Sequence, residues 1–343
     1  ATCAVMANAV LRRGAQPVFA DIDPVTYGSN AASIAAVVSS RTRMIVAQHS
    51  FGIPCDIEPI ASLANDRGIF LLEDCALSFG SKRNRKIVGR FGDAALFSTD
   101  HTKPINTLVG GLIYTEKSSL GDLLKRINEH SAEVSHSRQR HLARQLLLEA
   151  SHATPETLGK LRLKSLVRRK LFKQPSGFFD QDFANRPSGY AFPQRMPAFL
   201  AQIGLNEISE WPEKSAQRKQ TAKQILGILK SVGLEDNVRI YSDPSLEIEP
   251  LRIAYHTQDA VALRERLHAM IDTNAFWFGQ ALVGAKTDER TFGYVAGACP
   301  NAERVWPLMI NLPCNLSEQA SIVFIQELDK VLRKHVSKKR LSL

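Results

Sequence analysis

The first third of the chain alternates short apolar runs with helical patterns, and this alternation constrains the fold more than any other feature. The strand-like and helical runs follow one another at 16–23, 29–40, 43–50, 56–68 and 69–74. The helical run at 56–68 starts at Asp56, a typical N-cap residue, and closes at Gly68. Strand, helix, strand and helix at this spacing predict a parallel sheet with crossover helices.

The rest of the chain divides into three further patterns. We predict a large α/β domain over 1–190, with a basic helical insertion at about 120–185. Connecting helices are expected over 191–232, and a smaller α+β domain over 233–343. A chain of 343 residues is long enough to bury a core in each of the two domains.

The charge of the chain is strongly positive. It has 44 Lys and Arg residues against 34 Asp and Glu residues, a formal net charge of +10. Such a balance is compatible with nucleic acid, a membrane surface or phosphorylated small molecules. The basic run at 160–173 is either a solvated helix face or a site for anionic ligands or acidic lipids. It lacks interleaved aromatic residues, so we do not expect nucleic-acid binding.

The five cysteines are scattered, odd in number and without a Cys-x-x-Cys pair. This pattern favours neither a disulfide framework nor a zinc site, and it suggests a reducing compartment. No apolar run reaches the roughly 18 to 20 residues that span a bilayer. We therefore expect a cytoplasmic protein without an integral membrane segment and without a metal.

Three side chains of complementary chemistry follow the predicted strands. Asp74 ends the apolar run at 69–74, Ser98 closes the next one, and Lys103 lies in the turn beyond it. In an open parallel sheet such strand ends share one edge, where ligands bind. A carboxylate, a hydroxyl and an amine there match pyridoxal 5'-phosphate (PLP), through its ring nitrogen, phosphate and aldehyde. Taken singly, each is equally compatible with a salt-bridge partner, a turn residue or a surface amine.

Long stretches of the sequence resemble the DegT/DnrJ/EryC1/StrS sugar aminotransferases, a family of fold-type I PLP enzymes. The resemblance is carried by "TCAVMANAVLRRGAQPVFADIDPVTY", by "HSFGIPCDIEPI" with "LLEDCALSFGS", by "GRFGDAALFSTDHTKP", and by "QRMPAFLAQIGLNEI" and "CPNAERVWPLMINLPCNLSEQ". The lysine stands 29 residues after Asp74 and five after Ser98, as in the family. The matching stretches run along most of the chain outside about 120–185.

The resemblance implies a fold and a reaction. Lys103 would hold PLP and shuttle a proton, Asp74 would pair with the pyridine nitrogen, and Ser98 would bind the phosphate. The substrate would be a nucleotide-linked keto-sugar, with glutamate as amino donor, in polysaccharide or secondary-metabolite biosynthesis. The family also implies a homodimer with shared active sites.

Several positions depart from the family pattern. Leu77 stands where the family has Gln or His near the cofactor ring, and Cys3 lies where many members stack an aromatic residue. Val109 replaces an acidic residue, and Pro193 replaces an Asn. The family's N-terminal portion with its Gly-Thr phosphate loop would precede Ala1, so we expect a chain shortened at its N-terminus.

These departures leave two alternatives to an active aminotransferase. One is a weak or inactive relative that serves as a binding or dimer-partner module. The other is a PLP-dependent sugar dehydratase, which the intact Lys103 disfavours because that group typically carries histidine at this position.

Four further residues are candidate substrate contacts. His49 follows a predicted strand and His101 lies near Lys103, whereas Arg195 and Trp277 belong to later segments. Each has a plainer interpretation: a structural histidine, a turn residue, a salt-bridge partner and a core aromatic, respectively.

Overall fold

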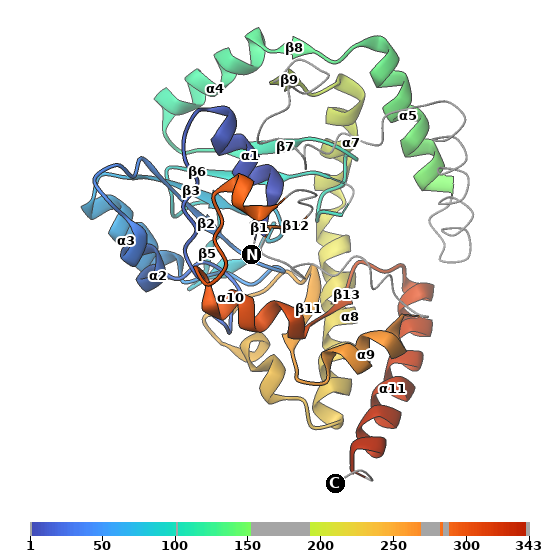
Figure 1. Ribbon diagram of the computed structural model, residues 1–343. Coiled ribbons are helices and arrows are strands. Elements are labelled where there is room, and N and C mark those ends of the chain that lie inside the picture. Colours follow the sequence, from blue (N-terminus) through green and yellow to red (C-terminus); the bar gives the residue numbers. More distant parts are fainter. Residues whose placement is uncertain (1, 101, 152–192, 269–281, 284–287, 341–343) are drawn as a thin grey trace.

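The computed structural model describes residues 2–100, 102–151, 193–268, 282–283 and 288–340 (Figure 1). Its main sheet has four strands in the order β2-β3-β6-β7, which are Met44–Gln48, Phe70–Asp74, Ala94–Ser98 and Gly111–Tyr114. The first three run parallel, and β7 joins the edge antiparallel to β6. The predicted, mostly parallel α/β fold is confirmed.

Helices α2 (Ala31–Val37) and α3 (Ile57–Asp66) supply the apolar cover of this sheet. The α3 residues Ile57, Ile60 and Ala64 are buried, a spacing that places them on one helix face. They pack with strand and helix residues in a single core cluster. The predicted helices at 29–40 and 56–68 therefore form, each slightly shorter than expected.

The predicted strand at 16–23 is wrong, since only a single bridge between Ile22 and Ser29 forms there. The carboxylate of Asp21 accepts hydrogen bonds from the backbone N–H groups of Asn301 and Ala302 instead. Asp23 accepts from its own turn. Short acidic side chains thus offer this segment hydrogen bonds that compete with a sheet ladder.

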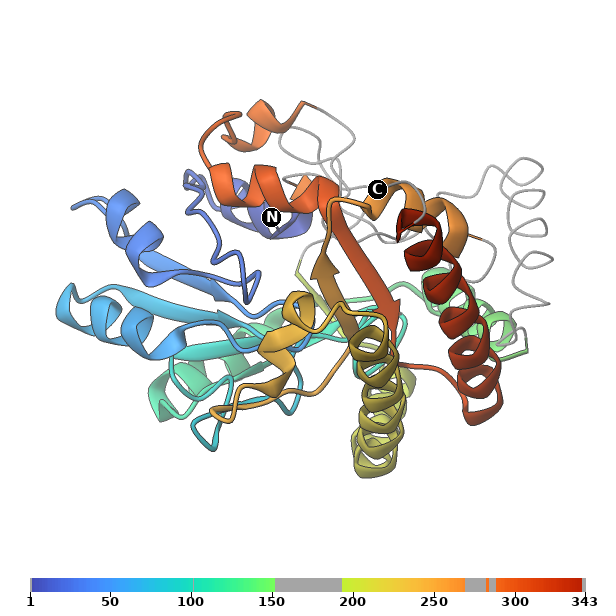
Figure 2. The same ribbon diagram turned by 90° about the horizontal axis from the view of Figure 1, so that it is seen from below.

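A second core surrounds the antiparallel pair β11 (Arg252–His256) and β13 (Met309–Pro313). Three helices enclose it: α8 (Trp211–Ser231), α9 (Ala260–Leu267) and α11 (Glu318–Arg340). Figure 2 shows these helices beside the strand pair. This arrangement is the expected C-terminal α+β unit, and the domain boundaries at 190 and 232 stay predictions.

The remaining elements are shorter or lie at the periphery. They are β1 (Thr2–Cys3), α1 (Ala4–Arg12), β4 (Lys82–Arg83), β5 (Lys86–Ile87), α4 (Ser118–His130), β8 (Ala132–Glu133), α5 (His136–Ser151), β9 (Gln194–Arg195), α7 (Ala198–Ser209), η1 (Asp236–Ser242), β10 (Leu246–Glu247), β12 (Leu282–Val283), η3 (Glu289–Phe292), α10 (Pro300–Val305) and η4 (Trp306–Leu308). Across the described ranges, no helix is both long and apolar enough to cross a membrane. The basic run predicted at 160–173 lies outside the described residues.

Candidate active site

Lys103 lies in a loop that leaves β6 and returns to β7, and paired threonines close this loop at its neck. The backbone N–H of Thr107 donates to the carbonyl of Thr99 at 2.8 Å, and the hydroxyl of Thr107 donates to that of Thr99 at 2.6 Å. Thr99 N–H in turn donates to the Gly110 carbonyl at 3.0 Å. Within the loop, the Lys103 N–H donates to the Asp100 carbonyl at 2.9 Å. The lysine is therefore presented by a closed, hydrogen-bonded turn.

The amine of Lys103 lies among groups that act on its charge. Burial lowers the pKa of Lys103 more strongly than its neighbours raise it, so the net pKa is below the ordinary lysine value. The neighbours that raise it are Asp74, Cys3 and Asp100, and Arg252 opposes them. A desolvated lysine amine with a lowered pKa is available as a nucleophile.

Asp74 ends β3 beside this amine and is almost fully buried. Burial raises the pKa of its carboxyl, while the N–H of Ala76 at 3.0 Å and the charge of Lys103 lower it. The net pKa lies above the ordinary value for aspartate. Asp74 is thus a buried carboxyl whose charge interacts with that of Lys103, and its predicted role toward the cofactor ring stays a prediction.

Glu73, its neighbour on β3, serves a different group of partners. Its carboxylate accepts hydrogen bonds from the backbone N–H groups of Gly89, Phe91 and Gly92 at 2.6–2.8 Å. Burial by itself raises the pKa of Glu73, but His49 and these N–H groups outweigh it, and the net pKa is lowered. Glu73 therefore holds the loop before β6 as an ionised structural carboxylate.

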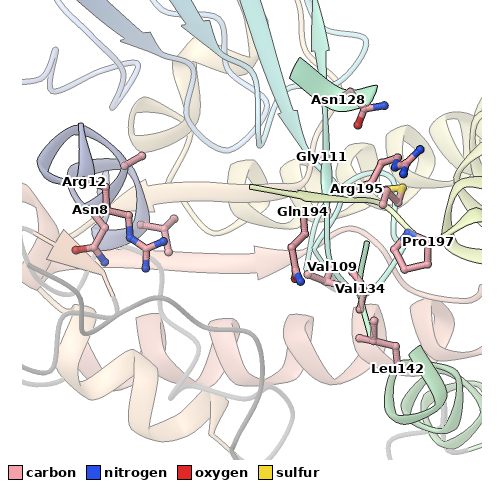
Figure 3. A pocket seen from close by; sticks show the side chains of 14 residues that line it. Asn8, Arg12, Val109, Gly111, Asn128, Val134, Leu142, Gln194, Arg195 and Pro197 are labelled. Carbon is pink, nitrogen blue, oxygen red and sulfur yellow. The ribbon is translucent and has the colours of Figure 1, made fainter. Parts of the chain in front are cut away.

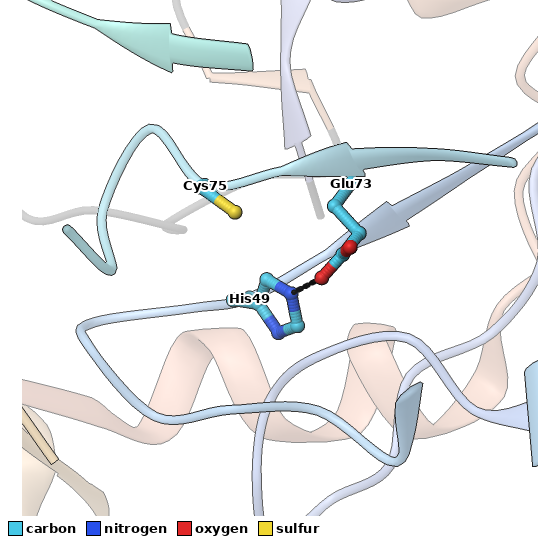
Figure 4. Close-up of side chains that lie close together, drawn as sticks. All are labelled: His49, Glu73 and Cys75. Atoms are coloured by element: carbon cyan, nitrogen blue, oxygen red, sulfur yellow. Dashed lines mark hydrogen bonds and ion pairs between the residues drawn. The ribbon is translucent and has the colours of Figure 1, made fainter. Parts of the chain in front are cut away.

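His49 is fully buried against Glu73 and Cys75 (Figure 4). Its Nδ1 accepts the backbone N–H of Cys55 at 3.0 Å, so the ring proton lies on Nε2, which faces Glu73 Oε2 at 3.2 Å. Ligand atoms of His49, Glu73 and Cys75 lie within 4.8 Å of one another. Because both ring nitrogens of His49 already have hydrogen-bond partners, we interpret this cluster as a hydrogen-bond network and not as a metal centre. A substrate contact by His49 stays a prediction that this geometry does not favour.

Three other predicted cofactor residues surround the same strand ends. Ser98 is the last residue of β6, in register with Gly111 of β7. Cys3 precedes α1, and burial raises the pKa of its thiol while the charge of Lys103 lowers it. Leu77 is buried in an apolar cluster with Tyr27 and other side chains. The structure brings Cys3 and Asp74 to Lys103, whereas Leu77 offers only apolar surface.

A cavity of about 400 Å³ lies between α1, the segment after the lysine loop and β9 (Figure 3). Two guanidinium groups, Arg12 and Arg195, belong to its lining, together with the amides of Asn8 and Gln194. None of the lining residues is acidic. The cavity is therefore suited to a negatively charged ligand.

Arg195 is held on β9, which pairs with β8 in parallel. Its Nη2 donates to Glu133 at 3.1 Å, and its buried Nε has no hydrogen-bond partner among the residues described. A substrate or interface contact through Arg195 stays a prediction. His101 and Trp277, the other predicted contacts, lie outside the described residues.

Two arginines near Lys103 were not predicted. Arg252 begins β11, and its charge acts on Lys103. Arg218 is buried on α8, and its Nη2 donates to the carbonyl of Pro104 at 3.1 Å. In the sequence both are ordinary arginines of a basic chain, because only the tertiary fold brings residues more than 100 positions away to the lysine loop.

Comparison with curated proteins gives relatives that include two sugar-nucleotide enzymes by name. GDP-perosamine synthase from Escherichia coli O157:H7 is 41% identical over 115 residues, which are 34% of this chain and 32% of that protein. UDP-N-acetyl-3-dehydro-alpha-D-glucosamine 3-aminotransferase from Acidithiobacillus ferrooxidans is 36% identical over 127 residues, 37% of this chain and 34% of that protein. The chain thus matches about a third of the length of these curated relatives.

Solved aminotransferase structures share this fold over nearly the whole chain. The aminotransferase TlmJ from Streptoalloteichus hindustanus superposes with a TM-score of 0.66 at 21% identity, over 97% of this chain and 78% of that chain. Helicobacter pylori PseC, an aminotransferase of pseudoaminic acid biosynthesis, gives 0.66 at 17% identity, over 97% and 79%. These likenesses show the fold-type I aminotransferase fold.

The family model tests the resemblance noted from the sequence motifs. The model of the DegT/DnrJ/EryC1/StrS aminotransferase family matches residues 1–321, most of the chain. The lysine and the buried aspartate at the carboxyl edge of the parallel sheet are the residues for which the sequence motifs predicted a role in PLP binding, and that role stays a prediction. On this match, the chain is a member of the DegT/DnrJ/EryC1/StrS family of PLP-dependent aminotransferases.

Proposed function

We propose that this protein transfers an amino group from glutamate to a nucleotide-linked keto-sugar, using PLP, in polysaccharide or secondary-metabolite biosynthesis. The observation that carries the proposal is the juxtaposition of Lys103 and Asp74. Burial lowers the pKa of the Lys103 amine. The carboxyl of Asp74, at the end of β3, interacts with that amine through its charge.

The residues around Lys103 fit PLP. Lys103 would hold the aldehyde carbon, Asp74 would keep the ring nitrogen protonated, and Ser98 would bind the phosphate. When bound, PLP supplies an electron sink for the substrate's bond-breaking step. The amine of Lys103 takes the proton from the substrate carbon and returns it, a role that its lowered pKa favours.

The cavity beside α1 supports an anionic substrate. Arg12 and Arg195 bring two guanidinium groups to a lining without carboxylates. Arg195 also pairs with Glu133 outside the lining, and guanidinium groups suit phosphate oxygens. The names of the relatives include a GDP-sugar and a UDP-sugar enzyme. A sugar nucleotide, whose diphosphate would lie near the two arginines, is therefore the proposed substrate class.

The expected dimer and compartment belong to the same proposal. The edge strand β7 exposes Leu112, Ile113 and Tyr114, an apolar surface of the kind that a second copy can cover. All five cysteines are free thiols, which fits the reducing cytoplasm.

Absorbance spectroscopy tests the cofactor part of the proposal. The purified protein mixed with PLP is expected to acquire the absorbance band of lysine-bound PLP, which borohydride makes permanent. Lys103→Ala should abolish the band, and Lys82→Ala, a surface lysine paired with Glu247, should keep it. A band that survives in Lys103→Ala would refute the assignment of the lysine.

A second candidate, a weak or inactive family member acting as a binding or dimer-partner module, is favoured by Leu77. This side chain is buried in an apolar cluster and cannot offer the hydrogen bond that Gln or His gives. Addition of glutamate to the PLP-loaded protein separates the two. Loss of the band and formation of 2-oxoglutarate support the aminotransferase, whereas an unchanged band supports the binding module.

A further inference from the structure

Arg218 connects the long helix α8 to the loop that presents Lys103. The side chain is 8% exposed, and its Nη2 donates to the carbonyl of Pro104 at 3.1 Å. Pro104 directly follows the lysine. Because a proline has no backbone N–H, the carbonyl is the backbone group through which Pro104 can form a hydrogen bond, and it accepts one from Arg218.

Among the residues that the structure describes, no carboxylate forms an ion pair with Arg218. Its guanidinium carbon lies 5.1 Å from the centre of the Trp211 ring, a cation–π arrangement. Glu207 pairs with Lys214 and Glu249 with Ser215, so both act on Arg218 only through their charge. Burial is the largest influence on the pKa of Arg218 and lowers it. Burying a charged group costs free energy unless the group is hydrogen-bonded. The hydrogen bond from Arg218 to the Pro104 carbonyl is therefore a specific contact.

The two ends of the lysine loop are held in different ways. At the neck, Thr99 and Thr107 pair with each other. At the tip, the contacts come from the α7–α8 region: Arg218 holds the Pro104 carbonyl, and Glu207 accepts the N–H of Asn106 at 3.4 Å. The position of Lys103 therefore depends on α8 as well as on the strands.

We propose that Arg218 is a positioning residue for Lys103, which fixes the loop tip so that the amine faces Asp74 and the cofactor. The proposal rests on the proposed function, because it assigns Arg218 a role in PLP binding through the lysine. It predicts that loss of the guanidinium loosens the loop first and weakens PLP binding as a result.

Hydrogen exchange of the cofactor-free protein tests the first step. In Arg218→Met the backbone amides within 102–107, apart from Pro104, which has none, should exchange about tenfold faster, the equilibrium effect of losing one hydrogen bond to a charged group. Amides of β2 and β3 should keep their wild-type rates. Arg333→Met is the matched control, since Arg333 pairs with Asp329 on the surface of α11. Unchanged exchange at 102–107, or equal acceleration in β2 and β3, would overturn the proposal.

PLP titration tests the second step. Arg218→Met should bind PLP about tenfold more weakly and shift the pH midpoint of its absorbance band, and Arg218→Lys should restore part of both. Wild-type affinity and midpoint in Arg218→Met would overturn the proposal. Absence of the band in the wild-type protein would refute the proposed function instead, and hydrogen exchange would still decide whether Arg218 orders the loop.

Discussion

At the scale of single residues, two adjacent carboxylates acquire different tasks from their surroundings. Successive side chains of a strand point to opposite faces, so Glu73 meets the backbone N–H groups of the 89–92 loop while Asp74 acts on Lys103. The sequence predicted an acidic pair at a strand end, and the cofactor role that it assigned to the second member stays a prediction. The structural role of the first member depends on a loop whose path no local pattern specifies.

Replacing Glu73 with Gln should destabilise the fold by about 3 kcal/mol, because a buried carboxylate with several donors loses its charge. The folded-state pKa of Glu73 is lowered, so its contribution is full above the ordinary glutamate value of 4.5 and falls as pH drops through the folded value. Urea unfolding at pH 7 and at pH 4 measures both effects. Glu116→Gln, at an exposed ion pair with Arg90, should change stability by less than about 1 kcal/mol.

Tyr255 and Tyr241 form a matched pair for a second test. The hydroxyl of Tyr255 is buried without a hydrogen-bond partner among the described residues, so Tyr255→Phe should leave stability unchanged or raise it by about 1 kcal/mol. The hydroxyl of Tyr241 accepts the N–H of Ala254 at 2.8 Å, and Tyr241→Phe should cost about 1–2 kcal/mol. Thermal unfolding of both variants is the measurement. Equal losses in the two would contradict the difference in their partners.

At the scale of elements, a helix with a clear apolar spacing was predictable, as α3 shows, because its periodicity is local. The strand expected at 16–23 did not form, since its acidic residues bind backbone groups elsewhere. The loop between β6 and β7 was predictable only in part. Its lysine and glycines are visible in the sequence, but the threonine pair that closes it is recognisable only in three dimensions.

Gly110 ends this loop with φ of +129°, a conformation that other residues rarely adopt. Because of this φ, Gly110→Ala should destabilise the protein by about 1–3 kcal/mol and weaken PLP binding; the new Cβ would also displace the flexible Cε of Met196, which lies 2.2 Å from its position. Gly227→Ala, in the exposed part of α8 with nothing near its Cβ, should instead stabilise by up to about 1 kcal/mol. Denaturant unfolding with PLP titration compares them, and the same sign of change in both would contradict the strain at Gly110.

At the scale of the whole molecule, the start of the chain shares a core with residues within 282–302. Ala4 and Ala7 of α1 pack with Phe292 and Tyr294, and β1 pairs with β12. Because Cys3 and the start of α1 lie beside Lys103 and the cavity, distant C-terminal residues support the candidate active site.

Phe292→Ala should therefore reduce stability by about 3–5 kcal/mol, the loss for a fully buried aromatic residue. It should also weaken PLP binding, because α1 loses its support. Val295→Ala, 62% exposed, is the neighbouring control and should change neither quantity appreciably. Urea unfolding and PLP titration measure the two effects. A destabilised Phe292→Ala variant with unaltered PLP affinity would show that α1 does not depend on this contact.

The sequence by itself determined the parallel sheet and the crossover helices, and it marked Lys103, Asp74 and Ser98 as candidate cofactor residues, since strand periodicity and strand-end chemistry are local properties. Tertiary structure alone decided what surrounds the lysine. Burial that lowers its pKa, the contact of Arg218 with the loop tip and the charge of Arg252 all arise from residues far apart in the chain. The physical reason is that desolvation and packing depend on which segments come into contact, and the spacing of residues along one strand does not specify those contacts.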